Sequence, residues 1–78
     1  MSKKELTEGE RRTYESVIKF IDEHGYPPTC RELCEETGLK STSCIHKYLI
    51  RLTNKKMIFA TGKPRAIKVI GYRFVKEN

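Results

Sequence analysis

Hydrophobic positions along this chain repeat with two different periods. In two stretches they recur at i, i+3, i+4 and i+7, the spacing that places side chains on one face of a helix. The members of the first stretch are Tyr14, Val17, Ile18 and Ile21, and those of the second are Ile45, Tyr48, Leu49 and Leu52. Beyond residue 56 the pattern changes to short apolar runs at 57–60 and 66–70, which are typical of β-strands. The pattern therefore predicts helices followed by a hairpin.

Capping residues predict where the helices begin and end. Thr7 and Thr29 each precede a glutamate by three residues, the arrangement of a capping box at a helix start. Gly25 and Gly38 lie where a helix can end in the left-handed conformation. Ser41 is a good N-cap for the helix that contains the second apolar stretch. The expected helices span residues 8–24, 30–37 and 42–54.

Residues 30–54 combine a short helix, a tight glycine turn and a longer helix, which is the arrangement of a helix-turn-helix motif. A plain helical hairpin is the alternative, although its loop is more often longer and more polar. The hairpin at 57–70 has a basic tip in a turn with Gly and Pro, and would form a wing. Apolar and aromatic residues alternate again in the tail 71–78, as in a further strand or a docked segment. The predicted fold is mainly α with a small β-hairpin, a three-helix winged helix-turn-helix in one domain.

The charge of the chain is unevenly distributed. Residues 1–39 carry six Lys/Arg and nine Asp/Glu, a net charge of −3, whereas residues 40–78 carry ten Lys/Arg and one acid, a net charge of +9. A basic half on a small domain points to a polyanion, most often a nucleic acid. A merely solubilising surface would spread its charges more evenly, so the asymmetry favours a nucleic-acid partner.

The predicted helix at 42–54 has the shape and surface of a recognition helix. Its outer face collects Ser43, Lys47, Ile50 and Asn54, opposite the apolar stripe. At ~1.5 Å per residue the stretch 41–54 is roughly 21 Å long, which fits a DNA major groove. The alternative is a solvated outer face on an ordinary core helix.

Four short stretches between residues 6 and 70 resemble the N-terminal DNA-binding domain of the LexA family of repressors. They are Leu6-Thr7; Gly25-Tyr26-Pro27-Pro28-Thr29 followed by Arg31-Glu32-Leu33; Gly38-Leu39-Lys40-Ser41 leading to His46 and Leu49; and Lys63-Pro64-Arg65-Ala66-Ile67. The Gly-x-Pro-Pro-Thr connector and the Lys-Pro-Arg-Ala-Ile motif are fairly specific in combination, whereas a bare helix-turn-helix would not be.

The resemblance implies a winged helix-turn-helix that binds an operator in double-stranded DNA and represses transcription, as in the SOS response. In the family, the start of the third helix reads base edges. Carried over by position, the base-reading residues would be Ser41, Ser43, Cys44, His46 and Lys47. The equivalent residues of the wing are Lys63 and Arg65.

Basic side chains of the second half would supply phosphate contacts and most of the salt-dependent affinity. The candidates are Lys40, Arg51, Lys55, Lys63 and Arg65. Lys47 could donate to guanine in the major groove. Because one such module is small, high specificity is expected to need two copies, a homodimer on a palindromic operator.

The family's full-length repressors continue into a second domain with a serine–lysine dyad that cuts the chain at a small-residue bond. This sequence ends at Asn78 and contains no Ala-Gly dipeptide, so self-cleavage and the dimerisation it supports are in doubt. The segment 71–75 looks more like a structured ending than a flexible linker, which favours a naturally short protein over an isolated domain.

Two other partners are compatible with the sequence. The first alternative is a protein–protein interaction module with only non-specific DNA affinity, supported by Ile50 on the polar outer face and by the aromatic tail at Tyr72 and Phe74. RNA is a weaker option, because no aromatic stacking platform is apparent.

The cysteines and histidines do not form a convincing metal or catalytic site. Cys30, Cys34, Cys44 and His46 could in principle be four ligands, but residues 44 and 46 lie ~200° apart around a helix. No metal, cofactor or small-molecule substrate is therefore expected. His46 has no evident carboxylate to orient it, so we expect no enzyme activity. Cys44 lies in the first helical turn, where oxidation could switch off DNA binding, although a plain packing role is the simpler interpretation.

The sequence also predicts where the protein works. No stretch approaches the ~20 apolar residues of a membrane span, so no membrane partner is expected. The N-terminus has basic residues but no apolar run behind them, unlike a signal peptide. We therefore expect a cytoplasmic protein.

Overall fold

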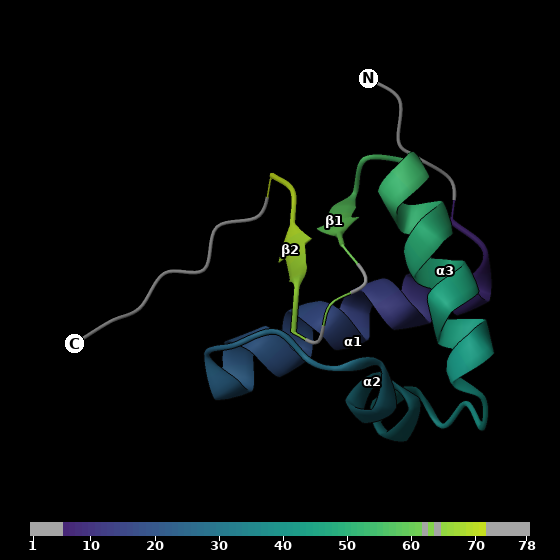
Figure 1. Ribbon diagram of the computed structural model, residues 1–78, viewed down its shortest axis with the longest axis horizontal. Coiled ribbons are helices and arrows are strands. Elements are labelled where there is room, and N and C mark those ends of the chain that lie inside the picture. Colours follow the sequence, from purple (N-terminus) through teal and green to yellow (C-terminus); the bar gives the residue numbers. More distant parts are fainter. Residues whose placement is uncertain (1–5, 62, 64, 72–78) are drawn as a thin grey trace.

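Three helices and a two-stranded hairpin follow one another along the chain (Figure 1). The computed structural model describes residues 6–61, 63 and 65–71. The elements are α1 (Glu8–His24), α2 (Cys30–Thr37), α3 (Thr42–Asn54), β1 (Ile58–Ala60) and β2 (Ile67–Val69). This order confirms the predicted fold class, a mainly helical winged helix-turn-helix. The wing is the hairpin of residues 57–70, in which the strands β1 and β2 are three residues each.

Both predicted capping boxes are present. The Thr7 hydroxyl accepts from the Glu10 amide at 3.2 Å, and the Glu10 carboxylate accepts from the Thr7 amide at 3.1 Å. Thr29 and Glu32 make the same reciprocal pair at the start of α2. At the other ends, Gly25 and Gly38 have φ of 84° and 80°, the left-handed conformation that a side chain would disfavour. Local sequence therefore sets the limits of α1 and α2.

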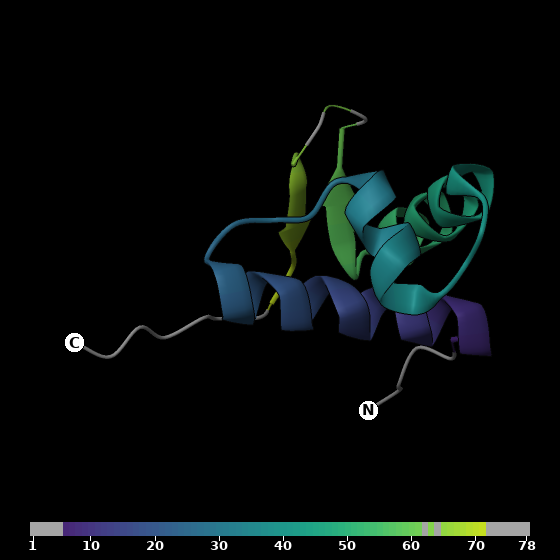
Figure 2. The same ribbon diagram turned by 90° about the horizontal axis from the view of Figure 1, so that it is seen from below.

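The core draws on every element. Its buried members are Val17, Leu33, Ile45, Leu49, Leu52, Ile58, Ile67 and Val69. Figure 2 shows α1 as a base, with α2, α3 and the wing standing on one side of it. In the apolar stripe predicted for α1, Val17 is buried, but Tyr14, Ile18 and Ile21 are only half-buried. The central line of the buried face instead runs through Glu10, Thr13, Val17 and Phe20, because the start of α1 faces polar groups of α3.

The wing pairs its strands in antiparallel register. Ile58 lies opposite Val69 and Ala60 opposite Ile67, so these side chains face the core, while Phe59 and Lys68 face outward. The Ile70 amide donates to the Met57 carbonyl at 3.0 Å and closes the open end of the hairpin. The tail predicted at 71–78 falls, apart from Gly71, outside the described residues. Within the described part of the chain, no helix is both long and apolar enough to cross a membrane.

Candidate nucleic-acid interface

The first two turns of α3 present a polar, exposed surface above a buried apolar face. Ile45, Leu49 and Leu52 are buried against α1, α2 and β1. The five residues predicted to read bases are all exposed: Ser41, Ser43, Cys44, His46 and Lys47. The helix thus brings these five groups together. Ile50 is also exposed, at 59%, on the same outer side.

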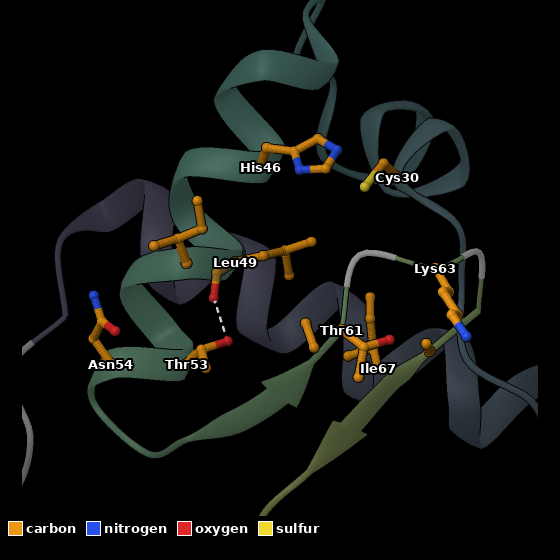
Figure 3. Close-up of a pocket in the computed structure, with 11 residues that line it drawn as sticks. Cys30, His46, Leu49, Thr53, Asn54, Thr61, Lys63 and Ile67 are labelled. Carbon is orange, nitrogen blue, oxygen red and sulfur yellow. Dashed lines mark hydrogen bonds between the residues drawn. The ribbon is translucent and has the colours of Figure 1, made fainter.

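Two of these residues have a second role in the structure. The Ser41 hydroxyl accepts from the Ser43 amide at 3.1 Å, so Ser41 is the N-cap of α3. Its hydroxyl can still donate to a DNA acceptor. His46 projects from the flank of α3 toward Cys30 on α2, over a groove, rather than straight outward (Figure 3). Any base contact by His46 would therefore come from the side of the helix that faces the wing.

That groove lies between α3 and the wing and has a volume of about 320 Å³. Leu49, Ile50, Ala60 and Ile67 contribute apolar side chains to its lining, and polar groups line it as well. These are His46, Thr53, Asn54, Thr61 and Lys63 (Figure 3). Burial raises the pKa of the Cys30 thiol in its wall, and the neighbouring Cys34 raises it further. Cys30 therefore stays protonated near neutral pH and is a poor nucleophile.

The far end of α3 is held down by a buried carboxylate. Glu10, only 2% exposed, accepts from Lys55 Nζ at 2.7 Å and lies 3.7 Å from Arg51 Nη1. The hydrogen bond from Lys55 lowers the pKa of Glu10, against the opposing effect of burial. Arg51 and Lys55 were predicted to contact phosphates. In the structure both lie against Glu10, so a phosphate would have to compete with this carboxylate, and the phosphate contacts stay predictions.

A glycine in α1 permits close approach of α3. A Cβ at Gly9 would overlap Cζ and Oη of the Tyr48 ring. Tyr48, predicted as part of the apolar face, is half-buried and fills the space that Gly9 leaves. Together with Glu10, Gly9 fixes how α3 lies across the start of α1. No pattern in the sequence predicted that either residue matters for this packing.

Arg65 also forms an ion pair within the fold, at the surface of the domain. Its guanidinium makes a bidentate ion pair with Glu32 on α2, and this hydrogen bond lowers the pKa of Glu32. Arg65 pairs with α2 in the structure, and its predicted phosphate contact stays a prediction. Lys40, Lys47 and Lys63 are exposed and form no ion pair within the described residues. Of the predicted cations, these three are best placed to meet an anion.

The cysteines are free thiols, half-buried at Cys30 and Cys34 and exposed at Cys44. Among the described residues, no three His, Cys, Asp or Glu side chains come together as a metal site would require. The groove and the exposed face of α3 therefore offer hydrogen bonds, apolar contacts and positive charge as their means of binding.

Comparison with known proteins shows the family to which the chain belongs. Residues 3–66 match the family model described as the LexA DNA binding domain. The chain belongs to the LexA DNA-binding domain family. This result confirms the resemblance inferred from the connector and wing motifs. The match covers a DNA-binding module, which is not a catalytic domain, and it favours DNA over a protein partner.

Several LexA repressors are similar to this LexA-type domain. The protein from Caldicellulosiruptor saccharolyticus is 49% identical over 69 residues, which is 87% of this chain and 34% of that protein. A relative from Desulfatibacillum aliphaticivorans is 43% identical over 67 residues, 85% of this chain and 33% of that protein. One from Clostridium perfringens is 40% identical over 68 residues, 86% of this chain and 34% of that protein. The chain thus spans about a third of the length of these relatives.

Proposed function

We propose that this LexA-type domain binds an operator in double-stranded DNA as part of transcriptional repression of the SOS type. In this proposal α3 lies in the major groove and the wing rests on the adjoining backbone. The observation that carries the proposal is the exposed polar surface at the start of α3, held rigidly because Ile45, Leu49 and Leu52 on the other face are buried. A reader of base edges needs this combination of exposed donors and a fixed helix axis.

We propose different tasks for the residues of this surface, and their exposures support this division. Ser43, Cys44 and Lys47 project from the first turns of α3, where base edges would be met, with Lys47 able to donate to guanine. Lys40 precedes the helix and Lys63 lies at the tip of the wing, so both suit phosphates on either side of the groove. Ser41 and His46 contribute from the cap and from the flank of the helix.

In this proposal, two copies of the domain bind a palindromic operator, and the pairing makes the binding sequence-specific. A single recognition helix of 13 residues contacts only a few base pairs, whereas two helices one DNA turn apart read a longer site. The whole relatives are about three times as long, and their further residues are where we place a dimer contact. For the isolated domain we therefore expect weak pairing that becomes evident only on DNA.

Selection from a randomised duplex pool at ~150 mM salt tests the proposal, because non-specific electrostatic binding is weakened there. We expect enrichment of one motif, with two inverted half-sites. Failure to enrich any motif, together with binding that disappears as salt rises, would refute sequence-specific recognition. The selected duplex would then serve as the operator in the experiments below.

A further inference from the structure

Two motifs that are far apart in the sequence meet at one place in the fold. The connector before α2, residues 25–29, and Arg65 in the turn of the wing are separated along the chain by all of α2 and α3. In the structure, the side chain of Arg65 reaches back from the wing to the connector and to the first turn of α2. The exposed face of α3 takes no part in this contact.

The guanidinium of Arg65 is held from three directions. Nη1 and Nη2 donate to Oε1 and Oε2 of Glu32 at 3.0 and 2.9 Å, a bidentate pair. Nη1 also donates to the carbonyl oxygen of Pro27 at 3.0 Å. The Arg65 Cζ lies 4.6 Å from the centroid of the Tyr26 ring, within cation–π range. We call this group of four residues the Arg65 clamp.

The partners of Arg65 are themselves fixed by local structure. Glu32 is the third residue of α2 and the glutamate of its capping box, and its Oε1 also accepts from the Thr29 amide at 2.9 Å. The Tyr26 ring packs edge-on against Phe20 of α1, with ring centroids 5.7 Å apart. The clamp therefore connects the wing to a rigid corner where the connector joins α1 to α2.

The wing needs such an attachment. Strands of three residues form a ladder that is marginal without tertiary support. Arg65 itself has φ of 57°, a left-handed conformation that a non-glycine residue seldom adopts. Its side-chain contacts hold that conformation, two residues after Lys63 in the same turn.

We propose that Arg65 is a positioning residue, which docks the tip of the wing on the start of α2 and so presents Lys63 to the DNA backbone. In this assignment Arg65 does not bind a phosphate itself. The inference rests on the proposed DNA binding for its functional consequence. Its structural core is the claim that the Glu32–Arg65 pair holds the tip of the wing in one conformation, and this claim can be tested without DNA.

Replacing Glu32 gives opposite results under the two possible roles of Arg65. If Arg65 bound a phosphate, Glu32 would compete with the DNA, and Glu32→Gln would raise the affinity. If Arg65 positions the wing, Glu32→Gln removes one arm of the clamp and lowers the affinity, although the variant is less negative. Glutamine still accepts from the Thr29 amide, so the capping box survives the change.

The binding experiment measures the Kd of wild type, Glu32→Gln and Arg65→Gln on the selected operator over a range of salt concentrations. The clamp predicts that both variants bind about three- to tenfold more weakly. Glu36→Gln, an exposed carboxylate on the same helix, is the matched control. Its loss of negative charge should leave affinity unchanged or slightly higher.

The salt dependence separates positioning from phosphate binding. Each phosphate contact that is lost reduces the slope of log K against log salt by about 0.9. We expect that reduction for Lys63→Gln, and a reduction no larger than that for Arg65→Gln, because loss of the clamp removes the Lys63 contact. Adding Arg65→Gln to Lys63→Gln should then leave the slope unchanged. A further fall of about 0.9 in the double variant, or tighter binding by Glu32→Gln, would overturn the proposal.

A measurement on the free protein keeps the clamp testable if the proposed function fails. Amide hydrogen exchange should become faster at Ala66 and Thr61, whose amides donate near the tip of the wing at 3.2 and 3.3 Å. The Ile70 amide, at the open end of the hairpin, should keep its protection in Glu32→Gln. Unchanged exchange at the tip in both clamp variants would overturn the structural core. Faster exchange in a protein that enriches no DNA motif would refute only the proposed function.

Discussion

Glu10 offers the sharpest test of how α3 is held in place. It is 2% exposed and accepts from both the Thr7 amide and Lys55 Nζ, with Arg51 3.7 Å away. Glu10→Gln keeps an acceptor for the Thr7 amide but removes the charge. Removing one partner of a fully buried pair destabilises by about 3–5 kcal/mol. The Lys55 side chain is 33% exposed and that of Arg51 49%, so both reach water. We therefore expect a loss of about 1–3 kcal/mol at pH 7.

The dependence on pH has a definite sign. The pKa of Glu10 is lowered in the folded protein from its ordinary value of 4.5, chiefly by the hydrogen bond from Lys55. Its charge therefore adds stability that is complete above pH 4.5 and is lost as the pH falls through the lower folded-state pKa. The difference between wild type and Glu10→Gln should accordingly be constant from pH 7 to about 5.5 and shrink below pH 4.5.

Urea unfolding, followed by circular dichroism at several pH values, measures this difference. Glu8→Gln is the control, because Glu8 is an exposed carboxylate on the same helix that pairs with Arg12 at 3.5 Å. Exposed pairs of this type contribute about 0–0.5 kcal/mol. A loss at Glu10 no larger than at Glu8, or one that persists undiminished in acid, would refute the role assigned to Glu10.

Three further predictions concern residues on or beside α3. Gly9→Ala should destabilise the protein by about 1 kcal/mol when Tyr48 is present, because the new methyl group would overlap the Tyr48 side chain. In a Tyr48→Ala background only helix propensity remains, so Gly9→Ala should stabilise the protein by about 0.5–1 kcal/mol. A double-mutant cycle, followed by urea unfolding, measures both effects. Lys47→Ala should weaken operator binding by about 1–3 kcal/mol and relax base preference at one position. An equal loss of affinity on random DNA would contradict base reading. The control Lys19→Ala, on α1, should change neither the affinity nor the base preference. Iodoacetamide should modify the exposed Cys44 well before Cys30, as mass spectrometry over time would show, and unchanged operator binding after peroxide treatment would exclude a redox switch at Cys44.

The helices could be predicted because local sequence determines where each one begins and ends. A threonine hydroxyl and a glutamate three residues later each accept from a backbone amide at the start of a helix, wherever that helix lies in the fold. Gly25 and Gly38 end helices because glycine readily adopts the left-handed conformation. The period of the apolar residues likewise identified which face of α3 is buried. None of these inferences requires knowledge of what the element packs against.

Contacts between distant elements were not predictable in the same way. Tyr48 belongs to the apolar stripe of α3, but the sequence does not show that its ring occupies the space above Gly9. A glycine inside the first turn of a helix was the available signal, since glycine is unfavourable there without a packing reason. The stripe predicted for α1 was similarly displaced, because Glu10 and Thr13 are buried by partners that only the tertiary structure supplies.

The sequence did not predict that three of the cations expected to contact phosphates form ion pairs within the fold, for one physical reason. A basic half and an acidic half of one small domain attract each other before either meets DNA. The two capping-box glutamates, Glu10 and Glu32, accept these cations, because each carboxylate has lone pairs left after capping its helix. Glu10 takes Lys55 and Arg51, which anchor the end of α3, and Glu32 takes Arg65, which anchors the wing.

Among the described residues of the basic half, the basic side chains that are not in ion pairs are all of one residue type. Within the described part of the basic half, both arginines are in ion pairs, and the exposed Lys/Arg side chains without an ion pair are all lysines. These are Lys40, Lys47, Lys56, Lys63 and Lys68. Arginine's planar fork suits a fixed carboxylate, whereas lysine is a mobile point charge that can follow a phosphate. The salt slope on the operator should therefore reflect contacts by these lysines and fall well short of the full +9 charge of residues 40–78.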